Sequence, residues 1–365
     1  MSCFEIIHQN SPARTGVLKI HSGKIKTPFF MPVATKGAVK NILHKELTKM
    51  DFECVISNAF INYLKPGLEI IENAGGLHKF MSWDKAIFTD SGGFQLILDH
   101  FNPKVTNKGV YLTNPFDKSR ELISPEKSIE IQNKLGSDVA MVLDHQPLFG
   151  KKRSDYLDST IRTIEWAKRC KAAHKNKNQL LFGIAQGGNH ADLRQKCALA
   201  LTKIGFDGVA LGGFGIGEAQ SDMYRIIRAV KKVLPKNNPT YVMGIGSPLE
   251  ILGAISNGAD CFDSAYPTRM ARHGKIFTSN GNLEISKAVN KKNLAPLDKE
   301  CDCFVCKEYS RSYLHHLYKT YEQNAHILLS YHNIYFIQNL IKNIRTSIEE
   351  GEFTKFKKSF ESKYK

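Results

Sequence analysis

The sequence lacks a long uninterrupted run of apolar residues. A membrane-spanning helix needs roughly 18 or more such residues in a row, and no stretch of the chain reaches that length. Residues 1–10 also lack the basic patch and apolar core that mark a secretory signal peptide. We therefore expect a cytoplasmic protein with no membrane partner, in which the eight cysteines are reduced thiols or metal ligands and not disulfides.

Acidic residues are scarce relative to basic ones. The chain has 35 Asp and Glu against 51 Lys and Arg, which gives a formal net charge of +16. Such an excess favours a polyanionic partner, because each neutralised phosphate releases condensed counterions. A generally basic proteome would give the same balance, so charge alone leaves nucleic-acid binding open.

The sequence has no internal repeat, and its apolar residues gather in eight short runs that each end in a small or polar residue. Runs that are apolar almost throughout are typical of parallel strands covered on both faces. The runs are residues 29–34, 54–58, 86–90, 139–144, 180–186, 208–213, 240–246 and 260–265. Helical patterns separate most of them, at residues 124–135, 154–173, 190–204 and 221–233. The alternation predicts an α/β protein with a (β/α)8 TIM barrel, and a doubly wound open sheet is the alternative.

Polar residues and glycines mark the ends of these predicted strands. Asp90, Asp144, Gln186, Gly213 and Asp263 each stand at or near the end of an apolar run. Enzymes with a barrel fold carry their functional groups at the carboxyl ends of the strands. Any one of these residues would also fit an ordinary turn, whereas the set together predicts a ligand site.

Two of these residues, Asp90 and Asp263, indicate a particular chemistry. Two carboxylates on one barrel rim suit displacement at the anomeric carbon of a sugar, where one attacks and the other transfers protons. A single aspartate at a strand end is more often a helix cap or a turn former. The pattern therefore leaves a structural role open for either residue taken alone.

Three cysteines, Cys301, Cys303 and Cys306, lie close together in the sequence. Three thiolates need a fourth ligand to complete a tetrahedral zinc site, and histidine often supplies it. The downstream candidates are His315, His316, His326 and His332. We choose His332, which follows the apolar residues 327–330, and predict one structural Zn²⁺ per chain. Four protein ligands leave no position for a catalytic water; free thiols are the alternative.

Several motifs follow one another along the chain. They are residues 89–95 (TDSGGFQ), 182–188 (FGIAQGG), 212–213 (GG) with 217–218 (GE), 243–246 (MGIG), and 262–263 (FD) with 267–269 (PTR). In this order, and with the Cys-x-Cys-x-x-Cys cluster, they resemble the bacterial type of the tRNA-guanine transglycosylase family. The likeness runs from residue 23 to residue 333.

The resemblance implies a (β/α)8 barrel with a zinc-binding subdomain inserted near its end. Residues 1–278 would form the main part of the barrel, residues 279–335 the subdomain, and residues 336–365 a C-terminal helix that completes the barrel, with a basic tail. The composition agrees, because residues 279–300 are polar and rich in Lys and Asn and residues 355–365 carry five lysines. These lysines also fit a solvated helix face.

The resemblance also implies a reaction. Family members exchange the wobble guanine in the anticodon loop of tRNA for a 7-substituted 7-deazaguanine, through a covalent aspartyl–ribose intermediate, in queuosine modification. Asp263 matches the nucleophile and Asp90 the general acid/base. Asp144 matches the acid that reads the guanine-like edge, while Gln186 and the backbone N–H of Gly213 match the donors to its carbonyl oxygen. The remaining matches to the base pocket are Ser91, Gly92 and Gly93, with Phe94 and Met243 sandwiching the base.

Two further segments match the family's RNA-contacting residues beside the wobble base. They are Gly244, Ile245, Gly246, Ser247, Pro248, Leu249 and Glu250, and Thr268, Arg269, Met270, Ala271 and Arg272. Arg269 and Arg272 can bind phosphates or base edges, although salt bridges at the barrel rim are their plainer role. The resemblance further implies a homodimer, formed partly through the zinc region.

The chain departs from the bacterial pattern near the base pocket. His145 and Gln146 stand where familiar bacterial members have an acid and a cysteine, and residues 214–218 also differ. Both places flank the expected position of the 7-substituent. We therefore predict an altered base specificity, with queuine as the candidate in place of 7-aminomethyl-7-deazaguanine.

Two other functions remain as alternatives. A barrel glycoside hydrolase would use Asp90 and Asp263 on a carbohydrate, but it leaves the basic charge and the base-reading pair Asp144 and Gln186 unexplained. A non-catalytic tRNA-binding subunit would lack the nucleophile, so the presence of both Asp90 and Asp263 argues against it.

Overall fold

Eight parallel strands form a closed barrel in the computed structural model, which describes residues 2–93, 101–215 and 217–364. The strands are β4 (Phe29–Pro32), β5 (Cys54–Asn58), β6 (Ala86–Asp90), β10 (Val139–Met141), β11 (Leu180–Ala185), β12 (Gly208–Leu211), β13 (Thr240–Val242) and β14 (Cys261–Ser264). Each pairs with its neighbours in chain order, and a bridge between Val33 and Ile56 joins β4 to β5. The predicted (β/α)8 barrel is confirmed, and the open sheet is excluded.

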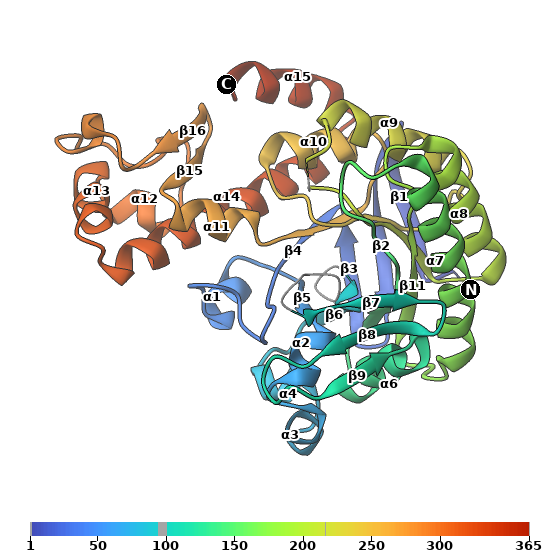
Figure 1. Ribbon diagram of the computed structural model, residues 1–365. Helices are drawn as coiled ribbons and strands as arrows, with labels where there is room; N and C mark the ends of the chain where they lie inside the picture. The colour runs from blue at the N-terminus through green and yellow to red at the C-terminus, as the bar shows by residue number, and fades with distance from the viewer. Residues whose placement is uncertain (1, 94–100, 216, 365) are drawn as a thin grey trace.

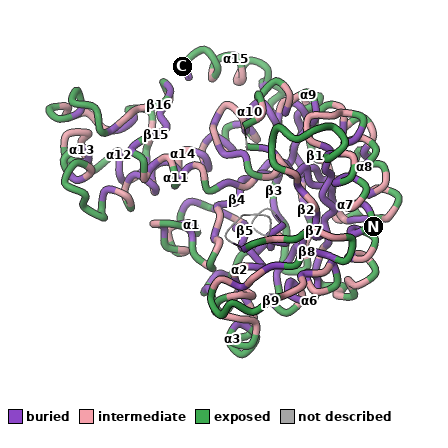
Figure 2. The backbone as a smooth tube through the Cα atoms, in the orientation of Figure 1, coloured by how far each residue is buried: buried purple, intermediate pink, exposed green. Residues whose placement is uncertain are grey.

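The barrel strands consist almost entirely of buried residues (Figure 2), and because successive side chains point to opposite faces, both faces of the sheet are covered. Four aromatic rings meet in its interior: Phe88 packs edge-to-face against Phe29, Phe182 and Tyr241, with ring centroids 5.7 to 6.2 Å apart. Several strands end earlier than predicted. Val142 and Leu143, for example, follow β10 in a loop that is fully buried, because an apolar run reports burial and not strand pairing.

Helices surround the barrel (Figure 1). They include α6 (Pro125–Leu135), α7 (Arg153–Ala173), α8 (Ala191–Ile204), α9 (Gln220–Lys231), α10 (Pro248–Ile255) and the long α14 (Gln323–Glu349). Local signals set their bounds. Before α6, Ser124 Oγ accepts a hydrogen bond from the Lys127 N–H, and after it Gly136 adopts a φ of +70° that favours glycine. The four predicted helices are confirmed to within two residues at each end.

Smaller elements decorate the barrel. The antiparallel strands β1 (Phe4–Asn10), β2 (Ala13–Ile20) and β3 (Gly23–Thr27) form one sheet, and β7 (Lys104–Thr106), β8 (Gly109–Thr113) and β9 (Arg120–Ile123) form another. Short helices α1 (His44–Lys49), α2 (Ala59–Leu64), α3 (Leu68–Asn73) and α4 (Leu77–Met81) lie between β4 and β6. The first sheet is anchored at the amino end of the barrel by a buried ion pair, Arg14 Nη2 to Asp260 Oδ2 at 2.6 Å.

A subdomain with its own apolar core lies between α11 (Tyr266–Arg272) and α14. It contains the hairpin of β15 (Lys275–Thr278) and β16 (Gly281–Glu284), then α12 (Phe304–Glu308) and α13 (Arg311–Lys319). The hairpin spans the boundary predicted at residue 278, and the division into domains remains a prediction. The last helix, α15 (Phe353–Lys363), packs near β16 through a Tyr364–Asn282 hydrogen bond.

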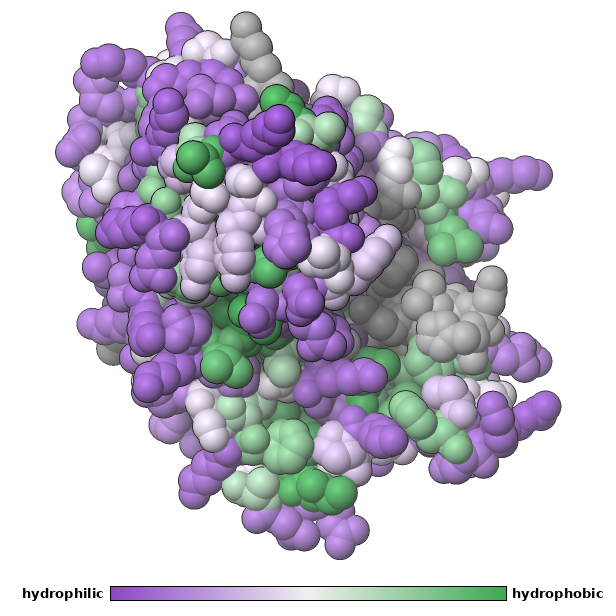
Figure 3. Space-filling model, turned by 90° about the vertical axis from the view of Figure 1, so that its left-hand side faces the viewer, coloured by the Kyte–Doolittle hydropathy of each residue, from purple (hydrophilic) through white to green (hydrophobic). Residues whose placement is uncertain are grey.

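The surface on the subdomain side is mixed. Figure 3 shows hydrophilic residues over most of this face, with apolar residues gathered in small patches among them. Within the described part of the chain, no helix combines the length and the apolar character that a membrane crossing requires.

Candidate active site

A cavity of about 220 Å³ opens at the carboxyl ends of the barrel strands. Its walls come from the ends of β6, β10, β11, β12, β13 and β14 and from the loops that follow them. The predicted site residues that line it are Asp90, Ser91, Gly93, Asp144, Gly213, Met243, Gly244, Asp263 and Arg269. The predicted strand-end residues therefore converge in one place.

Asp90 and Asp263 come from separate strands and line the same cavity. Asp263 Oδ1 accepts hydrogen bonds from the Tyr241 hydroxyl at 2.5 Å and from the Gly244 N–H at 3.0 Å. Asp90 Oδ1 accepts one from the Gly92 N–H at 3.1 Å. The two carboxyl groups thus accept different sets of hydrogen bonds, although they line one cavity.

The surroundings of Asp90 and Asp263 also affect the pKa values of the two carboxyl groups differently. Burial raises the pKa of Asp90 to about 7, and the negative charge of nearby Asp263 adds to this effect. Burial raises the pKa of Asp263 as well, but the hydrogen bonds from Tyr241 and Gly244 favour its ionised form. Near neutral pH, Asp90 is therefore the group that can carry and release a proton, and Asp263 is the better-stabilised carboxylate.

Asp144 and Gln186 form a hydrogen-bonded pair beside these carboxyl groups. Gln186 Nε2 donates to Asp144 Oδ2 at 2.6 Å, and both side chains are buried. Gln186 does not line the cavity itself but contacts Asp144 from behind it. Burial raises the pKa of Asp144 to about 6, although the Gln186 bond opposes the shift. Together they offer acceptor oxygens and an amide donor to a polar ligand.

Glycines let the backbone approach this pair closely. A methyl group on Gly93 would lie 2.6 Å from Asp144 Oδ1, and one on Gly212 would lie 2.6 Å from Gln186 Nε2. Gly213 has a φ of +78°, which favours glycine and sets the direction of its N–H. Met243 lines the cavity, whereas Phe94 lies outside the described residues.

Within each of the two segments predicted to contact RNA, some residues are exposed and others are buried. Arg269 is exposed, with its guanidinium carbon 5.7 Å from the centroid of the Tyr266 ring, and both residues line the cavity. Ile245 and Ala271 are 1% and 0% exposed, so their side chains pack in the core. The remaining members are buried or partly buried, apart from the exposed Gly244: Gly246, Ser247, Pro248, Leu249, Glu250, Thr268, Met270 and Arg272. In this set, Ser247 and Glu250 also form a capping box at the start of α10.

Of the two departures after Asp144, only Gln146 reaches the cavity. His145 turns toward α7, where its Nδ1 lies 3.0 Å from Arg162 Nη1. Burial lowers the pKa of His145 to about 4, and the neighbouring Arg162 lowers it further, so the imidazole is neutral at physiological pH. A carboxylate at this position would instead form an ion pair with Arg162.

Sequence reasoning missed Tyr241, whose hydroxyl contacts Asp263. Tyr241 is fully buried in β13, and in the sequence nothing distinguishes it from the other apolar residues of that strand. The available signal was its place two residues before Met243 within the run predicted as a strand (residues 240–246), because alternate residues of a strand face the same way. Tyr266 also lines the cavity, although no site role was predicted for it, and so do Gln146 and Phe214, which belong to the two places predicted to flank the 7-substituent.

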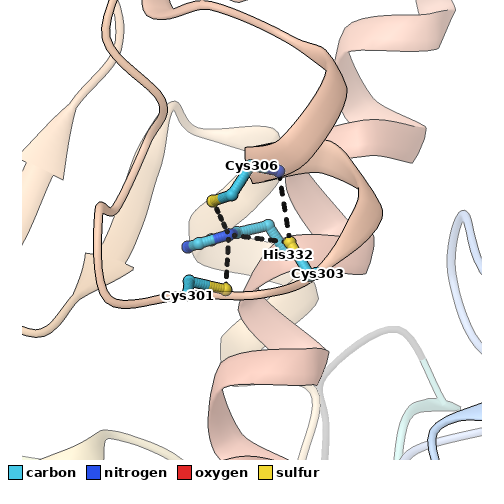
Figure 4. Close-up of side chains that lie close together, drawn as sticks. All are labelled: Cys301, Cys303, Cys306 and His332. Carbon is cyan, nitrogen blue, oxygen red and sulfur yellow. Dashed lines mark hydrogen bonds between the residues drawn. The ribbon is translucent and has the colours of Figure 1, made fainter.

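The predicted metal ligands converge in the subdomain (Figure 4). Cys301, Cys303 and Cys306 come from the loop before α12 and from that helix, and His332 comes from α14. His332 Nδ1 lies 3.8, 3.5 and 3.3 Å from their respective Sγ atoms. Zinc bond lengths place the sulfur and nitrogen ligands of a tetrahedral site roughly 3.5 Å apart. The four side chains can therefore hold one metal ion.

The hydrogen bond of the second ring nitrogen of His332 supports metal binding by this cluster. His332 Nε2 lies 2.7 Å from the Phe277 carbonyl oxygen, which can only accept, so Nε2 carries the hydrogen and Nδ1 is free to bind a metal. His315, an alternative candidate, instead points its Nδ1 at the Ile285 carbonyl at 2.7 Å. His332 is thus the histidine that completes the cluster.

Comparison with known proteins agrees with this geometry. The sequence model of the family described as "Queuine tRNA-ribosyltransferase" matches residues 9–365. The chain is 44% identical over 364 residues to the queuine tRNA-ribosyltransferase of Fusobacterium nucleatum, covering 99% of this chain and 98% of that protein. It is 45% identical over 354 residues to the protein of the same name from Thermotoga maritima, covering 97% and 96%. A match over nearly the whole length shows that the chain belongs to the queuine tRNA-ribosyltransferase family, the tRNA-guanine transglycosylases.

Proposed function

We propose that this protein exchanges the wobble guanine of a tRNA anticodon for a 7-substituted 7-deazaguanine. The observation that carries the proposal is the shared cavity of Asp90 and Asp263, beside the paired Asp144 and Gln186. A glycoside hydrolase would need the two carboxyl groups, but not a neighbouring set of acceptors and donors that matches a purine edge.

In the proposed reaction, Asp263 attacks C1′ of the target nucleoside and the bond from C1′ to guanine breaks. The ribose is then held as an ester of Asp263, and Asp90 gives a proton to the departing base. The incoming base loses a proton to Asp90 as its nitrogen attacks C1′, which releases Asp263. Asp90 suits this double role because its pKa is raised to about 7, so both of its forms are populated near neutral pH.

Recognition of the base uses the inner wall of the cavity. Asp144 would accept hydrogen bonds from a ring N–H and the exocyclic amine, while Gln186 Nε2 and the Gly213 N–H would donate to the carbonyl oxygen. The bond between Gln186 and Asp144 would exchange for bonds to the ligand. Met243 lies on the cavity wall, where it would cover one face of the ring, with Phe94 proposed for the other.

The tRNA would approach the open rim of the cavity. Its target nucleotide must leave the stack of the anticodon loop before C1′ can be reached. Arg269 is exposed at this rim and can bind a phosphate, and the net charge of +16 supplies attraction that does not depend on sequence. The buried side chains of Ile245 and Ala271 leave RNA contact in these segments to their neighbours and to the backbone.

The direct test is exchange of labelled guanine into a tRNA with guanine at the wobble position. The wild-type protein should incorporate label and leave a protein–RNA adduct that survives denaturing electrophoresis. Asp263→Asn should abolish both, and Asp90→Asn should slow both while the fold, checked by circular dichroism, stays intact. Binding of tRNA without exchange, or hydrolysis of simple glycosides, would contradict the proposal.

We further propose Zn²⁺ as the ion of the Cys301, Cys303, Cys306 and His332 site. Three thiolates and one imidazole match its soft, tetrahedral preference and leave no position for water, so the ion would stabilise the fold without entering the reaction. Elemental analysis of the purified protein should give one zinc per chain. A protein that folds equally well without zinc would overturn the assignment.

We also propose a homodimer that uses the zinc subdomain. In support, Val289 and Leu294 of this subdomain are 74% and 82% exposed, and a partner chain would cover these apolar side chains. Light scattering after size exclusion should give twice the 41.1 kDa chain mass. Val289→Asp combined with Leu294→Asp should shift the protein toward a monomer.

The base specificity follows from Gln146, which lines the cavity where we place the 7-substituent. A glutamine is more polar than a cysteine and can hydrogen-bond a hydroxylated substituent. We propose queuine as the preferred base. Competition between queuine and 7-aminomethyl-7-deazaguanine, in wild type and in Gln146→Cys, tests this, and equal or better use of the aminomethyl base by the wild type would remove it.

A further inference from the structure

Arg194 is a fully buried cation behind the base-reading wall of the cavity. It belongs to α8 and is 0% exposed. Its Nη1 donates to the Ala185 carbonyl at 2.6 Å and to the Gly212 carbonyl at 2.7 Å, and its Nε donates to the Gly188 carbonyl at 2.9 Å. One side chain therefore joins the ends of two neighbouring strands, β11 and β12.

These carbonyl groups flank the proposed base-reading residues. Ala185 precedes Gln186, Gly188 closes the turn after it, and Gly212 precedes Gly213. Arg194 Nη2 lies 3.6 Å from the position that a methyl group on Gly213 would occupy. The guanidinium also lies 4.8 Å from the centroid of the Phe214 ring, and Phe214 lines the cavity. Arg194 thus touches both loops without reaching the cavity.

Burial of the Arg194 charge is costly, and a buried charge is expected to have an ion-pair partner. Among the described residues, carbonyl oxygens and the face of an aromatic ring take the place of that partner. Charge-assisted hydrogen bonds to fixed carbonyl groups are strong and directional. They therefore hold the β11 and β12 loops at a set separation. A neutral side chain of the same size would fill the space but would leave three carbonyl groups, two of them buried, without this donor.

We infer that Arg194 is a positioning residue for base recognition, which sets the spacing between the Gln186 amide and the Gly213 N–H. The inference rests on the proposed function, because it needs a base whose carbonyl oxygen receives both donors. It adds a residue that acts through others and touches neither the base nor the ribose.

The charge of Arg194 has a second effect, on Asp144. The groups around the Asp144 carboxyl are Gln186 at the end of β11, Arg194 and Cys197 from α8, Cys170 from α7 and Asp90 from β6. Among them, Arg194 is the cation, and it lowers the pKa of Asp144 against the effect of burial. Loss of this charge should let Asp144 take up a proton at higher pH, which would remove an acceptor for the base.

The experiment compares Arg194→Met, Arg194→Lys and Arg14→Met in the full-length protein. Arg14 is a matched control at the opposite end of the barrel, because it is also buried and donates to Asp260 and to the backbone carbonyls of Lys236 and Asn238. Labelled guanine exchange into tRNA gives KM for the base, kcat and their pH profiles, and thermal unfolding reports stability.

We expect Arg194→Met to raise KM for free guanine about tenfold or more, with a smaller fall in kcat, and to move the acid limb of kcat/KM to higher pH. Arg194→Lys keeps the positive charge, so the acid limb of kcat/KM should stay at its wild-type pH. KM should still rise several-fold, because lysine lacks the planar, forked set of donors of the guanidinium group. Arg14→Met should lower the melting temperature and leave KM and the limb unchanged.

An unchanged KM in folded Arg194→Met would overturn the inference, and so would an equal KM increase in Arg14→Met. If Arg194→Met does not fold, Arg194→Lys decides the question. A wild-type KM in that variant overturns the inference, whereas a raised KM with an unchanged acid limb of kcat/KM supports it. Failure of the wild-type protein to exchange guanine would instead refute the proposed function, so the two failures are distinguishable.

Discussion

Tyr241→Phe removes a single hydroxyl group from beneath the proposed nucleophile. That hydroxyl donates to Asp263 Oδ1 at 2.5 Å, and Tyr241 is fully buried. A hydrogen bond to a charged group contributes about 1.5–3 kcal/mol, and each 1.36 kcal/mol is a factor of ten. Ionisation of Asp263 should therefore become roughly 10- to 100-fold less favourable, with the Gly244 N–H left as its donor among the described residues.

The loss should depend on pH in a defined direction. The Tyr241 bond opposes the rise that burial causes in the pKa of Asp263, so its removal raises that pKa further and leaves less carboxylate at low pH. Guanine exchange should then fall, by up to about one to two orders of magnitude at a pH below the pKa of Asp263. The deficit should shrink as the pH rises and Asp263 ionises. The assay is labelled guanine exchange over pH 5.5–9, with the yield of covalent tRNA adduct measured at each pH.

The matched control is Tyr63→Phe. The Tyr63 hydroxyl donates to Glu121 Oε2 at the same 2.5 Å, but neither residue lines the cavity. This variant should keep the wild-type pH profile even if it loses some stability. A Tyr241→Phe enzyme with a pH-independent loss, or a Tyr63→Phe enzyme with the same shifted profile, would refute the reasoning that the hydroxyl acts on the charge of Asp263.

Three further predictions address the rest of the site. Adduct formation should decline above about pH 7, because the pKa of Asp90 is about 7 and its protonated form is lost as the pH rises; rapid quench at single turnover measures this. Gly93→Ala places a methyl 2.6 Å from Asp144 Oδ1 and should weaken base binding about tenfold or more with little change in melting temperature, seen by calorimetry with guanine. Cys303→Ser should release the metal and lower the melting temperature by several degrees, measured by elemental analysis and thermal unfolding.

The fold was predictable where burial is continuous along the chain. All eight barrel strands appear as apolar runs because they are covered on both faces, and β5 and β6 match the predicted bounds to the residue. The sheet of β1, β2 and β3 was missed because β1 is mostly exposed or partly exposed beyond Phe4, so its sequence has no apolar run. Its attachment depends on Arg14 and Asp260, which lie 246 residues apart.

The site was predictable to the extent that its chemistry lies at strand ends. The place of Asp90, Asp144 and Asp263 in the cavity follows from the barrel rule together with the motifs, and the clustering of the four predicted metal ligands follows from their spacing and chemistry. Residues that act through a neighbour were not predictable. The role expected of Tyr241 depends on Asp263 beside it in the next strand, and the role proposed for Arg194 depends on which carbonyl groups its guanidinium reaches.

Asn333 links the subdomain that holds the Cys301, Cys303, Cys306 and His332 cluster to the cavity through hydrogen bonds. This residue follows His332 in α14 and is fully buried. Its Oδ1 accepts from the Phe277 N–H, and its Nδ2 donates to the Pro267 and Lys275 carbonyls, each at 3.0 Å. Pro267 lies in α11, the helix that carries Arg269 to the rim of the cavity. Because His332 also bonds to the Phe277 carbonyl, a bound metal fixes both residues at once. A distant structural ion can therefore set the position of the proposed RNA-binding arginine without taking any part in the reaction.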